Sequence, residues 1–284
     1  MIVTRFAPSP TGHLHLGHAH SALTGWHRTR AQSGRFLLRI EDIDVGRCRP
    51  EFEAAILEDL TWLGLDWTGP VRRQSDHLAD YEAALEKLRD LGLIYPCFCS
   101  RKDIAAAIAA PHGPEGPVYP GTCRNQPADL VRERQERGDP YALRLDVGKA
   151  QAQTGPLTFE DERQGVVAAR PETLGDVVLA RRDAPASYHL CVTLDDHLQG
   201  VTLVTRGVDL FHATHIHRLL QAILGLNVPT YLHHLLLTNA AGERLSKRDG
   251  AVALRALRQA GRSAAEVRGL AGFPDQTKTE PDRL

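Results

Sequence analysis

The beginning of the sequence places the strongest constraint on the fold. Residues 2–7 (IVTRFA) have the length and apolar character of a buried strand, residues 8–12 (PSPTG) form a turn, and a helical stretch begins near Leu14. A second strand is expected over Arg35–Asp44 (RFLLRIEDID), followed by a helix from Pro50, since proline suits a first helical turn. This order predicts βαβ units and hence an α/β fold with a parallel sheet.

The remainder of the sequence continues the mixed pattern. Leu78, Tyr81, Leu85 and Leu88 recur at the spacing of one helix face, in a helix that ends at Gly92. A helix is also expected over His215–Leu224, and at most two short helices near the C-terminus before a polar tail. Further strands are expected at YALRL (141–145), VVLAR (177–181), YHLCVTLDD (188–196), VTLVTR (201–206) and YLHHLLLT (231–238).

Composition limits the functional classes. No apolar run approaches the roughly 20 residues of a membrane span, and the N-terminus lacks the pattern of a signal peptide, so a cytoplasmic protein without a membrane partner is expected. The 34 basic and 35 acidic side chains nearly cancel, so a nucleic-acid partner would have to be held by a local basic surface. Five cysteines, an odd number, favour reduced thiols or a metal site over a disulfide framework.

The segment HLHLGHAH (13–20) concentrates four histidines at the expected helix start. A helix N-terminus attracts phosphate, and the imidazoles of His15 and His18, three residues apart with Gly17 between them, could add hydrogen bonds. The segment RLSKR (244–248) places Lys247 in a polar loop, where its ammonium could reach a polyphosphate. Taken separately, the histidines also fit a solvated helix end or a chance metal chelate, and RLSKR also fits a solvated basic loop.

Together, PSPTGHLHLGH and RLSKRDG resemble the HIGH and KMSKS signatures of class I aminoacyl-tRNA synthetases. RFAPSPTG, LLRIEDID, YHLCVTLDD, VTLVTRGVDL and LSKR resemble strings of the glutamyl branch, over residues 3–250. The resemblance implies that glutamate and ATP form glutamyl-adenylate without tRNA. It also implies that His15 and His18 contact the ATP phosphates, that Gly17 admits the adenine side and that Lys247 follows the departing pyrophosphate. Mg²⁺ is expected with ATP, held largely by phosphates and water.

Selection of glutamate requires basic and acidic side chains in one pocket. Arg5, at the end of the first strand, offers two parallel hydrogen bonds to a carboxylate, and Glu41 can accept from an ammonium. The resemblance assigns six residues to glutamate: Arg5, Ala7, Ser9, Glu41, Tyr188 and Arg206. On the residues alone, Arg5 and Glu41 also fit a structural ion pair, and Tyr188 fits an ordinary core position.

A metal site is expected among three cysteines. Cys97, Cys99 and Cys123 are one ligand short of a zinc site, and Tyr119 is the fourth candidate. On spacing alone, reduced cysteines without metal fit as well. The pattern CFCSRKD…VYPGTCR resembles the zinc motif of glutamyl-queuosine tRNA(Asp) synthetases, which implies one structural Zn²⁺. Cys48 and Cys191 are expected to pack in the protein. The segment HATHIH (212–217) also has a metal-like composition, but the resemblance implies a helix lining the pocket.

The same resemblance divides the chain into four parts. A Rossmann-like doubly wound parallel sheet is expected, with its first half over 1–94, a zinc-containing insertion over 95–184 and its second half with the KMSKS-like loop over 185–250. Residues 251–284 form a short C-terminal extension without an anticodon-binding domain. This arrangement resembles the glutamyl-queuosine group and implies transfer of glutamate to queuosine at the wobble position of the tRNA(Asp) anticodon.

Two other functions stay open, namely a short glutamyl-tRNA synthetase that charges an acceptor end and a noncatalytic RNA-binding protein on the synthetase scaffold. A monomer is expected in each case. The basic residues expected to contact RNA, or to be solvated surface charges, are Arg101, Lys102, Arg124, Arg181 and Arg182.

Overall fold

A computed structural model describes residues 1–100, 103, 118–181, 184–238 and 252–274 of the protein. Its first sheet is parallel, in the order β1-β2-β3. The strands are β1 (Val3–Phe6), β2 (Arg35–Ile40) and β3 (Arg72–Arg73). The crossover helices are α1 (Leu16–Arg30) and α2 (Pro50–Trp62). Residues 36–40 of β2 are all buried, as expected for a strand covered on both faces.

A second sheet continues the first on the other side of β1. It has the order β7-β6-β10-β9, in which β9, β10 and β6 are parallel and β7 forms an antiparallel hairpin with β6. Its strands are β6 (Thr158–Asp161), β7 (Gly165–Ala168), β9 (Leu203–Gly207) and β10 (Thr230–His234). The two sheets meet where the Thr202 amide donates to the Val3 carbonyl at 3.0 Å. An α/β fold with parallel strands is thereby confirmed.

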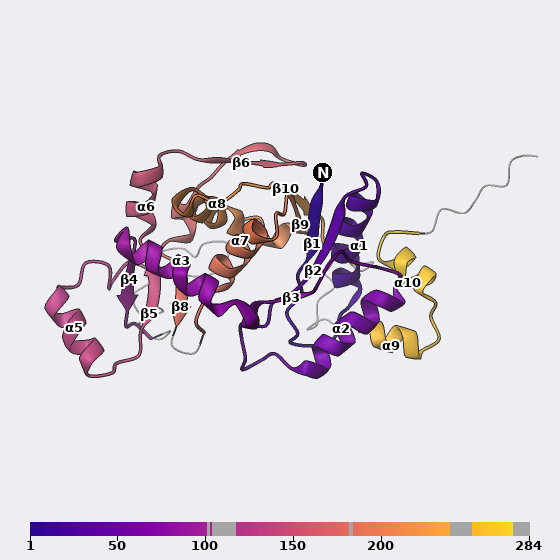
Figure 1. Ribbon diagram of the computed structural model, residues 1–284, viewed down its shortest axis with the longest axis horizontal. Helices are drawn as coiled ribbons and strands as arrows, with labels where there is room; N and C mark the ends of the chain where they lie inside the picture. The colour runs from indigo at the N-terminus through magenta and orange to yellow at the C-terminus, as the bar shows by residue number, and fades with distance from the viewer. Residues whose placement is uncertain (101–102, 104–117, 182–183, 239–251, 275–284) are drawn as a thin grey trace, which may run out of the picture.

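The third sheet is antiparallel, has the order β4-β5-β8, and lies at the opposite end of the molecule from α9 and α10 (Figure 1). Its strands are β4 (Ile94–Cys97), β5 (Ala142–Leu145) and β8 (Val178–Arg181), accompanied by α5 (Ala128–Glu136), α6 (Val147–Thr154) and the 3₁₀ helix η2 (Pro171–Leu174). Within the expected 95–184 insertion, however, residues 158–168 form a hairpin of the second sheet, in which β6 pairs with β10 and β7 pairs with β6. The division into four parts remains a prediction.

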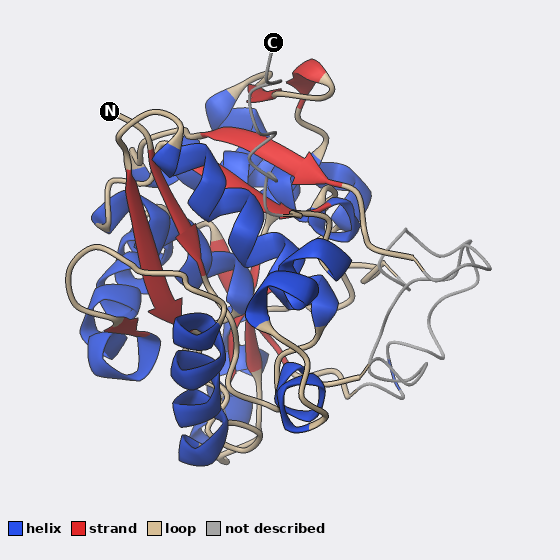
Figure 2. Ribbon diagram, turned by 90° about the vertical axis from the view of Figure 1, so that its right-hand side faces the viewer, coloured by secondary structure: helices blue, strands red, loops and turns tan. Residues whose placement is uncertain are grey.

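Helices enclose the strands (Figure 2). Those not yet named are α3 (Leu78–Asp90), α7 (Tyr188–Leu198), α8 (Ala213–Leu224), α9 (Leu254–Gln259) and α10 (Ala264–Leu270), with the 3₁₀ turns η1 (Gln74–His77) and η3 (Val208–Leu210). One apolar cluster joins α1 and α2 to α9 and α10, and a larger one joins α3, α6, α7 and α8. No helix among the described residues is long and apolar enough to cross a bilayer.

The strand expected at YHLCVTLDD is wrong, because these residues form helix α7. Residues 190–196 are all buried, so the segment shows neither the alternation of a half-exposed strand nor the single apolar face of a surface helix. The expected strand Arg35–Asp44 also ends early, at Ile40, and Glu41–Asp44 leave the sheet at its carboxyl end. Both differences bring acidic side chains toward the centre of the molecule.

Candidate functional site

The N-terminus of α1 holds two of the predicted histidines side by side. His15 is the N-cap, and its Nδ1 accepts a hydrogen bond from the Gly17 amide at 3.1 Å, while Nδ1 of His18 accepts from the His15 amide at 3.2 Å. The two ring centroids are 3.8 Å apart. Because each Nδ1 is an acceptor, each neutral ring carries its proton on Nε2. The Nε2–H groups of both imidazoles therefore lie at the helix start, where the rings themselves accept from the His15 and Gly17 amides.

The predicted lysine, Lys247, lies outside the described residues. The description resumes at residue 252, and residues 253 and 254 lie beside the histidines. Ala253 forms an isolated antiparallel bridge with His15, and the Leu254 amide donates to the Leu14 carbonyl at 2.8 Å. A segment far along the sequence thus returns to the N-terminus of α1.

An inner cavity of about 340 Å³ opens at the carboxyl ends of β1, β2 and β9. Such strand ends are the usual ligand position in open α/β sheets. All six residues predicted to bind glutamate line this cavity, together with His18. The structure therefore brings together residues separated by some two hundred positions in the sequence.

Arg206, at the base of the inner cavity, is surrounded by neutral side chains. Its Nε donates to Nε2 of His233 at 3.1 Å, its Nη2 to the Thr214 hydroxyl at 2.6 Å, and its Nη1 to both Nδ1 of His217 and the Tyr188 hydroxyl, at 3.2 and 3.3 Å. Arg206 is only 4% exposed, and no carboxylate pairs with it among the described residues. Within the described part of the chain, this buried cation of the cavity thus has no acidic partner.

The two histidines that touch Arg206 must be neutral, because a guanidinium only donates hydrogen bonds. Nδ1–H of His233 is left to donate to Asp161, whose carboxylate lies 2.6 Å away. Burial and the neighbouring Arg206 charge lower the pKa of His233 to about 4. Burial and the Arg206 charge also lower the pKa of His217, well below its usual value. Of these two histidines, His217 lies in the segment HATHIH, which was expected to line the pocket, whereas His233 was not expected there.

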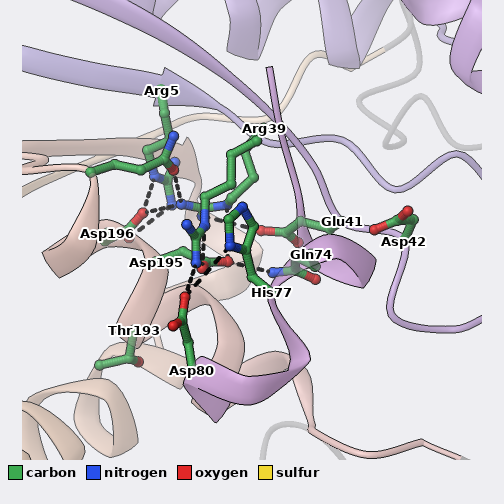
Figure 3. A network of polar contacts seen from close by, with 12 residues as sticks. Arg5, Arg39, Glu41, Asp42, Gln74, His77, Asp80, Thr193, Asp195 and Asp196 are labelled. Atoms are coloured by element: carbon green, nitrogen blue, oxygen red, sulfur yellow. Dashed lines mark hydrogen bonds and ion pairs between the residues drawn. The ribbon is translucent and has the colours of Figure 1, made fainter. Parts of the chain in front are cut away.

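Beside this shell lies a buried charge network, drawn in Figure 3. Arg5 donates from Nε and Nη2 to the two carboxylate oxygens of Asp196, at 2.8 and 3.3 Å. Arg39 donates to the same carboxylate at 2.8 Å and to Glu41 at 3.2 Å. Arg5 and Glu41 therefore do not form the ion pair that the residues alone allowed, because each has a different partner. Among the described residues, three of the five N–H groups of Arg5 donate hydrogen bonds. Two donate to Asp196 and one donates to the Thr205 carbonyl.

Asp195 connects the network to the rest of the fold. Its carboxylate is fully buried and accepts from Arg72 at 2.8 Å, from Gln74 at 3.0 Å and from Tyr81 at 3.0 Å. Burial raises the pKa of Glu41 even though Arg39 and Arg5 act in the opposite direction. These positioning residues were missed in the sequence, although an arginine inside the apolar run RFLLRI and the acid pair of TLDD are visible signals, since buried charges require partners.

Two further cavities follow the inner one in a row, so that the middle cavity borders the inner one and the outer cavity borders the middle one. The middle cavity, of about 280 Å³, shares Ser9, Thr11, Glu41 and Tyr188 with the inner cavity and extends to Ala180 and Arg181 on β8. The outer cavity, of about 400 Å³, shares Ala180 and Arg181 with the middle one and is completed by the chain between α5 and β5. The end of β8 thus forms a common wall between the middle and outer cavities.

The predicted metal ligands form a compact cluster. The three cysteine Sγ atoms lie within 4.8 Å of one another, and Sγ of Cys99 is 3.5 Å from Sγ of Cys123. The Tyr119 hydroxyl lies 3.3 Å from Sγ of Cys97 and 3.8 Å from Sγ of Cys99. In a tetrahedron with Zn–S bonds of about 2.3 Å, neighbouring sulfurs are about 3.8 Å apart. The three cysteines are therefore close enough together to hold one metal ion, and the phenol oxygen lies beside them.

The surroundings of this cluster favour an anionic Cys97 but a neutral Tyr119. The Arg144 guanidinium carbon lies 3.8 Å from the centroid of the Tyr119 ring. Burial acts to raise the pKa of Cys97, but hydrogen bonds from Tyr119, the backbone and Arg144 outweigh it and lower that pKa. Burial raises the pKa of Tyr119, so its hydroxyl would become a ligand anion only next to a bound cation.

The other predicted residues have different surroundings. Arg124 donates to Asp176 at 2.7 Å, which indicates a structural ion pair, whereas Arg181 is exposed between two cavities. Arg101, Lys102 and Arg182 lie outside the described residues. Cys191 is fully buried and Cys48 borders the middle cavity. In HATHIH, expected as a helix lining the pocket, His217 contacts Arg206 from α8.

Comparison with known proteins gives a consistent result. Residues 1–269 match the family described as tRNA synthetases class I (E and Q), catalytic domain. A "Glutamyl-Q tRNA(Asp) synthetase" of Rhodobacter capsulatus is 53% identical over 96% of this chain and 100% of the relative. A protein with the same name from Nocardia farcinica is 45% identical over 94% of this chain and 82% of the relative.

Among solved structures, a glutamate tRNA ligase from Elizabethkingia meningosepticum in complex with its amino acid is similar, with a TM-score of 0.73 and 29% identity. The match covers 88% of this chain and 52% of that one, so the chain spans about half the length of that ligase.

Proposed function

Because the chain belongs to the class I tRNA synthetases of the E and Q group, we propose that it activates glutamate with ATP and transfers the glutamyl group to queuosine in the anticodon of tRNA(Asp). As a member of this family it is a ligase of the aminoacyl-tRNA synthetase type. The choice of nucleoside rests on the names of the relatives from Rhodobacter and Nocardia. The choice of amino acid rests on those names and on the inner cavity.

The buried cation of the inner cavity is the observation that carries the proposal. A buried charge without a counter-ion is costly, so Arg206 favours a ligand that brings a carboxylate. The α-carboxylate of glutamate must reach ATP, which leaves the side-chain carboxylate for Arg206. Glu41, held by Arg39, would accept from the ammonium group. Glutamine has the same shape but no side-chain charge and would leave Arg206 uncompensated.

Adenylate formation would then occur between the inner cavity and the start of α1. The glutamate carboxylate attacks the α-phosphorus of ATP, a P–O bond to pyrophosphate breaks, and negative charge accumulates on the phosphates. The Nε2–H donors of His15 and His18 would stabilise that charge. Gly17 would border the nucleotide, Lys247 would follow the departing pyrophosphate, and Mg²⁺ would arrive with ATP.

The middle cavity is the proposed entrance for the acceptor nucleoside. It shares four residues with the inner cavity, so a nucleoside there would face the carbonyl carbon of a glutamyl-adenylate. Its wall contains Ser9, Thr11 and Asp44, whose side chains hydrogen-bond hydroxyl groups such as those of the cyclopentenediol of queuosine. Attack by one hydroxyl oxygen would form the ester, with loss of its proton and departure of AMP.

We infer that the cluster of three cysteines and Tyr119 binds one structural Zn²⁺, which would hold the start of the insertion together at the base of β4. Proposed boundaries follow from this: a catalytic half over 1–94, the zinc-bearing insertion within 95–184, the second catalytic half over 185–250 and the extension from 251. The protein would act in the cytoplasm on ATP, glutamate and tRNA, as a monomer.

The first test is glutamate-dependent exchange of labelled pyrophosphate into ATP, measured without tRNA. We expect exchange with glutamate but not with glutamine. Arg206→Gln should reduce kcat/KM for glutamate by about 100-fold or more, since an unpaired buried carboxylate costs about 3–5 kcal/mol. Arg262→Gln, at an exposed site paired with Glu266, is the matched control and should retain wild-type exchange.

The second test separates the two possible acceptors. Labelled glutamate should be transferred to tRNA(Asp) that contains queuosine and not to the same tRNA lacking it. Equal transfer to both tRNAs, or an ester at the 3′ end, would instead establish a short glutamyl-tRNA synthetase. Absence of exchange with glutamate in the purified wild-type protein would refute the proposed function as a whole.

A further inference from the structure

The outer cavity is lined by side chains that have no role in the proposed chemistry. It is bordered by Tyr141 and Leu143 on the β5 side, by Gln135 and Asp139 at the end of α5, and by Arg181 on β8. Its volume, about 400 Å³, falls in the usual range of ligand pockets, about 300 to 1,000 Å³. Tyr141 is 37% exposed, so a large aromatic side chain is available to a ligand in this cavity.

The Tyr141 ring is supported from below. Its centroid lies 5.5 Å from that of Phe98, and the guanidinium carbon of Arg134 lies 4.2 Å from the centroid of the Phe98 ring. Phe98 is only 9% exposed, so this arrangement fixes Tyr141 at the surface instead of burying it. Exposed aromatic rings on a rigid support are the surfaces on which proteins stack unpaired bases.

Charged side chains border the outer cavity. Asp139 pairs with Arg134 at 2.9 Å and with Arg137 at 2.8 Å, and Arg137 also pairs with Glu133 at 3.5 Å, so acids and bases balance at the end of α5. Arg181 adds a further cation at the wall shared with the middle cavity. Arg181 thus places a basic group next to the proposed entrance for the acceptor nucleoside.

We propose that the outer cavity binds the nucleotide adjacent to the acceptor nucleoside in the substrate RNA, with its base stacked on Tyr141 and its phosphate near Arg181. This inference rests on the proposed function, because it requires an RNA loop whose reactive nucleoside occupies the middle cavity. We infer a nucleotide in the outer cavity because the middle and outer cavities meet at Ala180 and Arg181. Two successive nucleotides of a single strand could therefore enter the two cavities. The neighbouring base is then unstacked from the acceptor nucleoside and held separately.

The test uses the full-length protein and an anticodon stem-loop that contains the acceptor nucleoside, with 2-aminopurine at the adjacent position on either side in two separate RNAs. One of the two probes should change fluorescence on binding to the wild type and to Tyr141→Phe, which keeps the ring. Tyr141→Ala should abolish that change and weaken binding by about tenfold or more, as expected for loss of one base–aromatic stack.

Matched measurements keep the outcome decisive. Leu130→Ala, an exposed apolar residue on α5 outside the outer cavity, should bind as the wild type does. Arg181→Gln should weaken binding and make the slope of log K against log salt shallower by about 0.7, the value for one phosphate on a single strand. Wild-type affinity and an unchanged probe signal in Tyr141→Ala would overturn the proposal.

Pyrophosphate exchange separates this failure from failure of the proposed function, because exchange uses no RNA. Exchange in a Tyr141→Ala protein that has lost the probe signal supports the outer cavity. A wild-type protein that lacks exchange but shows the Tyr141-dependent signal would refute the proposed chemistry while leaving the RNA subsite standing.

Discussion

The surroundings of Arg206 determine what the inner cavity can bind. Asp161 accepts from Nδ1–H of His233 and so fixes the tautomer in which Nε2 is free to accept from Arg206. His217 turns its Nδ1 toward the same guanidinium. Both histidines orient the arginine without neutralising it, so its charge remains available to a ligand. A carboxylate in place of either ring would compensate Arg206 internally and weaken the binding of an acidic amino acid.

His233→Phe should therefore raise KM for glutamate and leave KM for ATP unchanged. The ring keeps its approximate shape, but Nε of Arg206 loses its acceptor, and an unsatisfied buried donor costs about 1–3 kcal/mol. We expect an increase of about tenfold in KM for glutamate, measured by pyrophosphate exchange at saturating ATP. A parallel increase in KM for ATP would indicate general damage to the fold and contradict the positioning role.

The neighbouring residue supplies the control. His234 is also buried, but successive side chains of a strand point to opposite faces, and its Nδ1 contacts the Leu235 carbonyl instead of Arg206. His234→Phe should leave KM for glutamate within twofold of the wild type, a ratio that corresponds to ~0.4 kcal/mol of binding free energy.

At the same scale, the sequence revealed the cavity-lining residues better than it revealed their supports. The motifs around Arg5, Glu41, Tyr188 and Arg206 pointed to residues that the fold brings to one cavity. The partners of these residues depend on tertiary packing. Asp196 lies far from Arg5 in sequence, so no local pattern connects them, and the bidentate pair could be found only from the rule that buried charges require partners.

At the scale of elements, α7 shows why local patterns can fail. Its buried residues run without interruption from Leu190 to Asp196, and such runs occur in both buried strands and buried helices. In this helix, the carboxylates of Asp195 and Asp196 accept hydrogen bonds from arginines of β1, β2 and β3. The charged end of α7 thus joins three strands of the first sheet. Elements with a clear amphipathic period, such as α3, were predicted within a few residues.

The insertion supplies a prediction about zinc. We expect one zinc ion per chain, measured by atomic emission on protein purified without added metal. Tyr119→Phe should weaken zinc binding by at least about tenfold in competition with a chelator, because even the loss of an indirect contact to a metal ligand typically costs 10–100-fold. Cys123→Ser should lower the zinc content further, because it replaces a thiolate ligand by a hydroxyl.

Cys48→Ser is the matched control, since Cys48 lies outside the cluster, and it should retain a full complement of zinc. Competition curves for Tyr119→Phe that coincide with those of the wild type would show that the phenol oxygen is not a ligand. The sequence suggested this cluster from spacing, and the fold supplies what spacing could not, namely the approach of Arg144 to the Tyr119 ring.

At the scale of the whole molecule, three cavities in series connect the catalytic sheets to the insertion. The sequence indicated the first of them through its motifs. No sequence motif indicated the outer cavity, because loop residues around Tyr141 form it. Its relation to the acceptor nucleoside follows from the wall that it shares with the middle cavity.

The stability of the whole protein should depend on pH through its buried histidines. Burial lowers the pKa of His189 and of His233 to about 4, and lowers that of His217 well below its usual value. An unfolded chain binds protons on these rings below about pH 6.5, whereas the folded protein keeps them neutral. The unfolded state therefore holds more protons between pH 6.5 and about 4, and the free energy of unfolding falls as the pH is lowered through this window.

Urea unfolding at pH 7, 6 and 5 measures this dependence. Each ring that stays neutral contributes up to about 1.4 kcal/mol per pH unit well below pH 6.5, so the three together should make the loss steep by pH 5. The raised pKa of Glu41, caused by burial, acts in the opposite direction at the acidic end. His189→Gln removes one of the three rings and should reduce the slope by about one third. Stability that is constant between pH 7 and 5 would mean that the rings around Arg206 take up protons in the folded protein, and the inner cavity would then hold several positive charges instead of one.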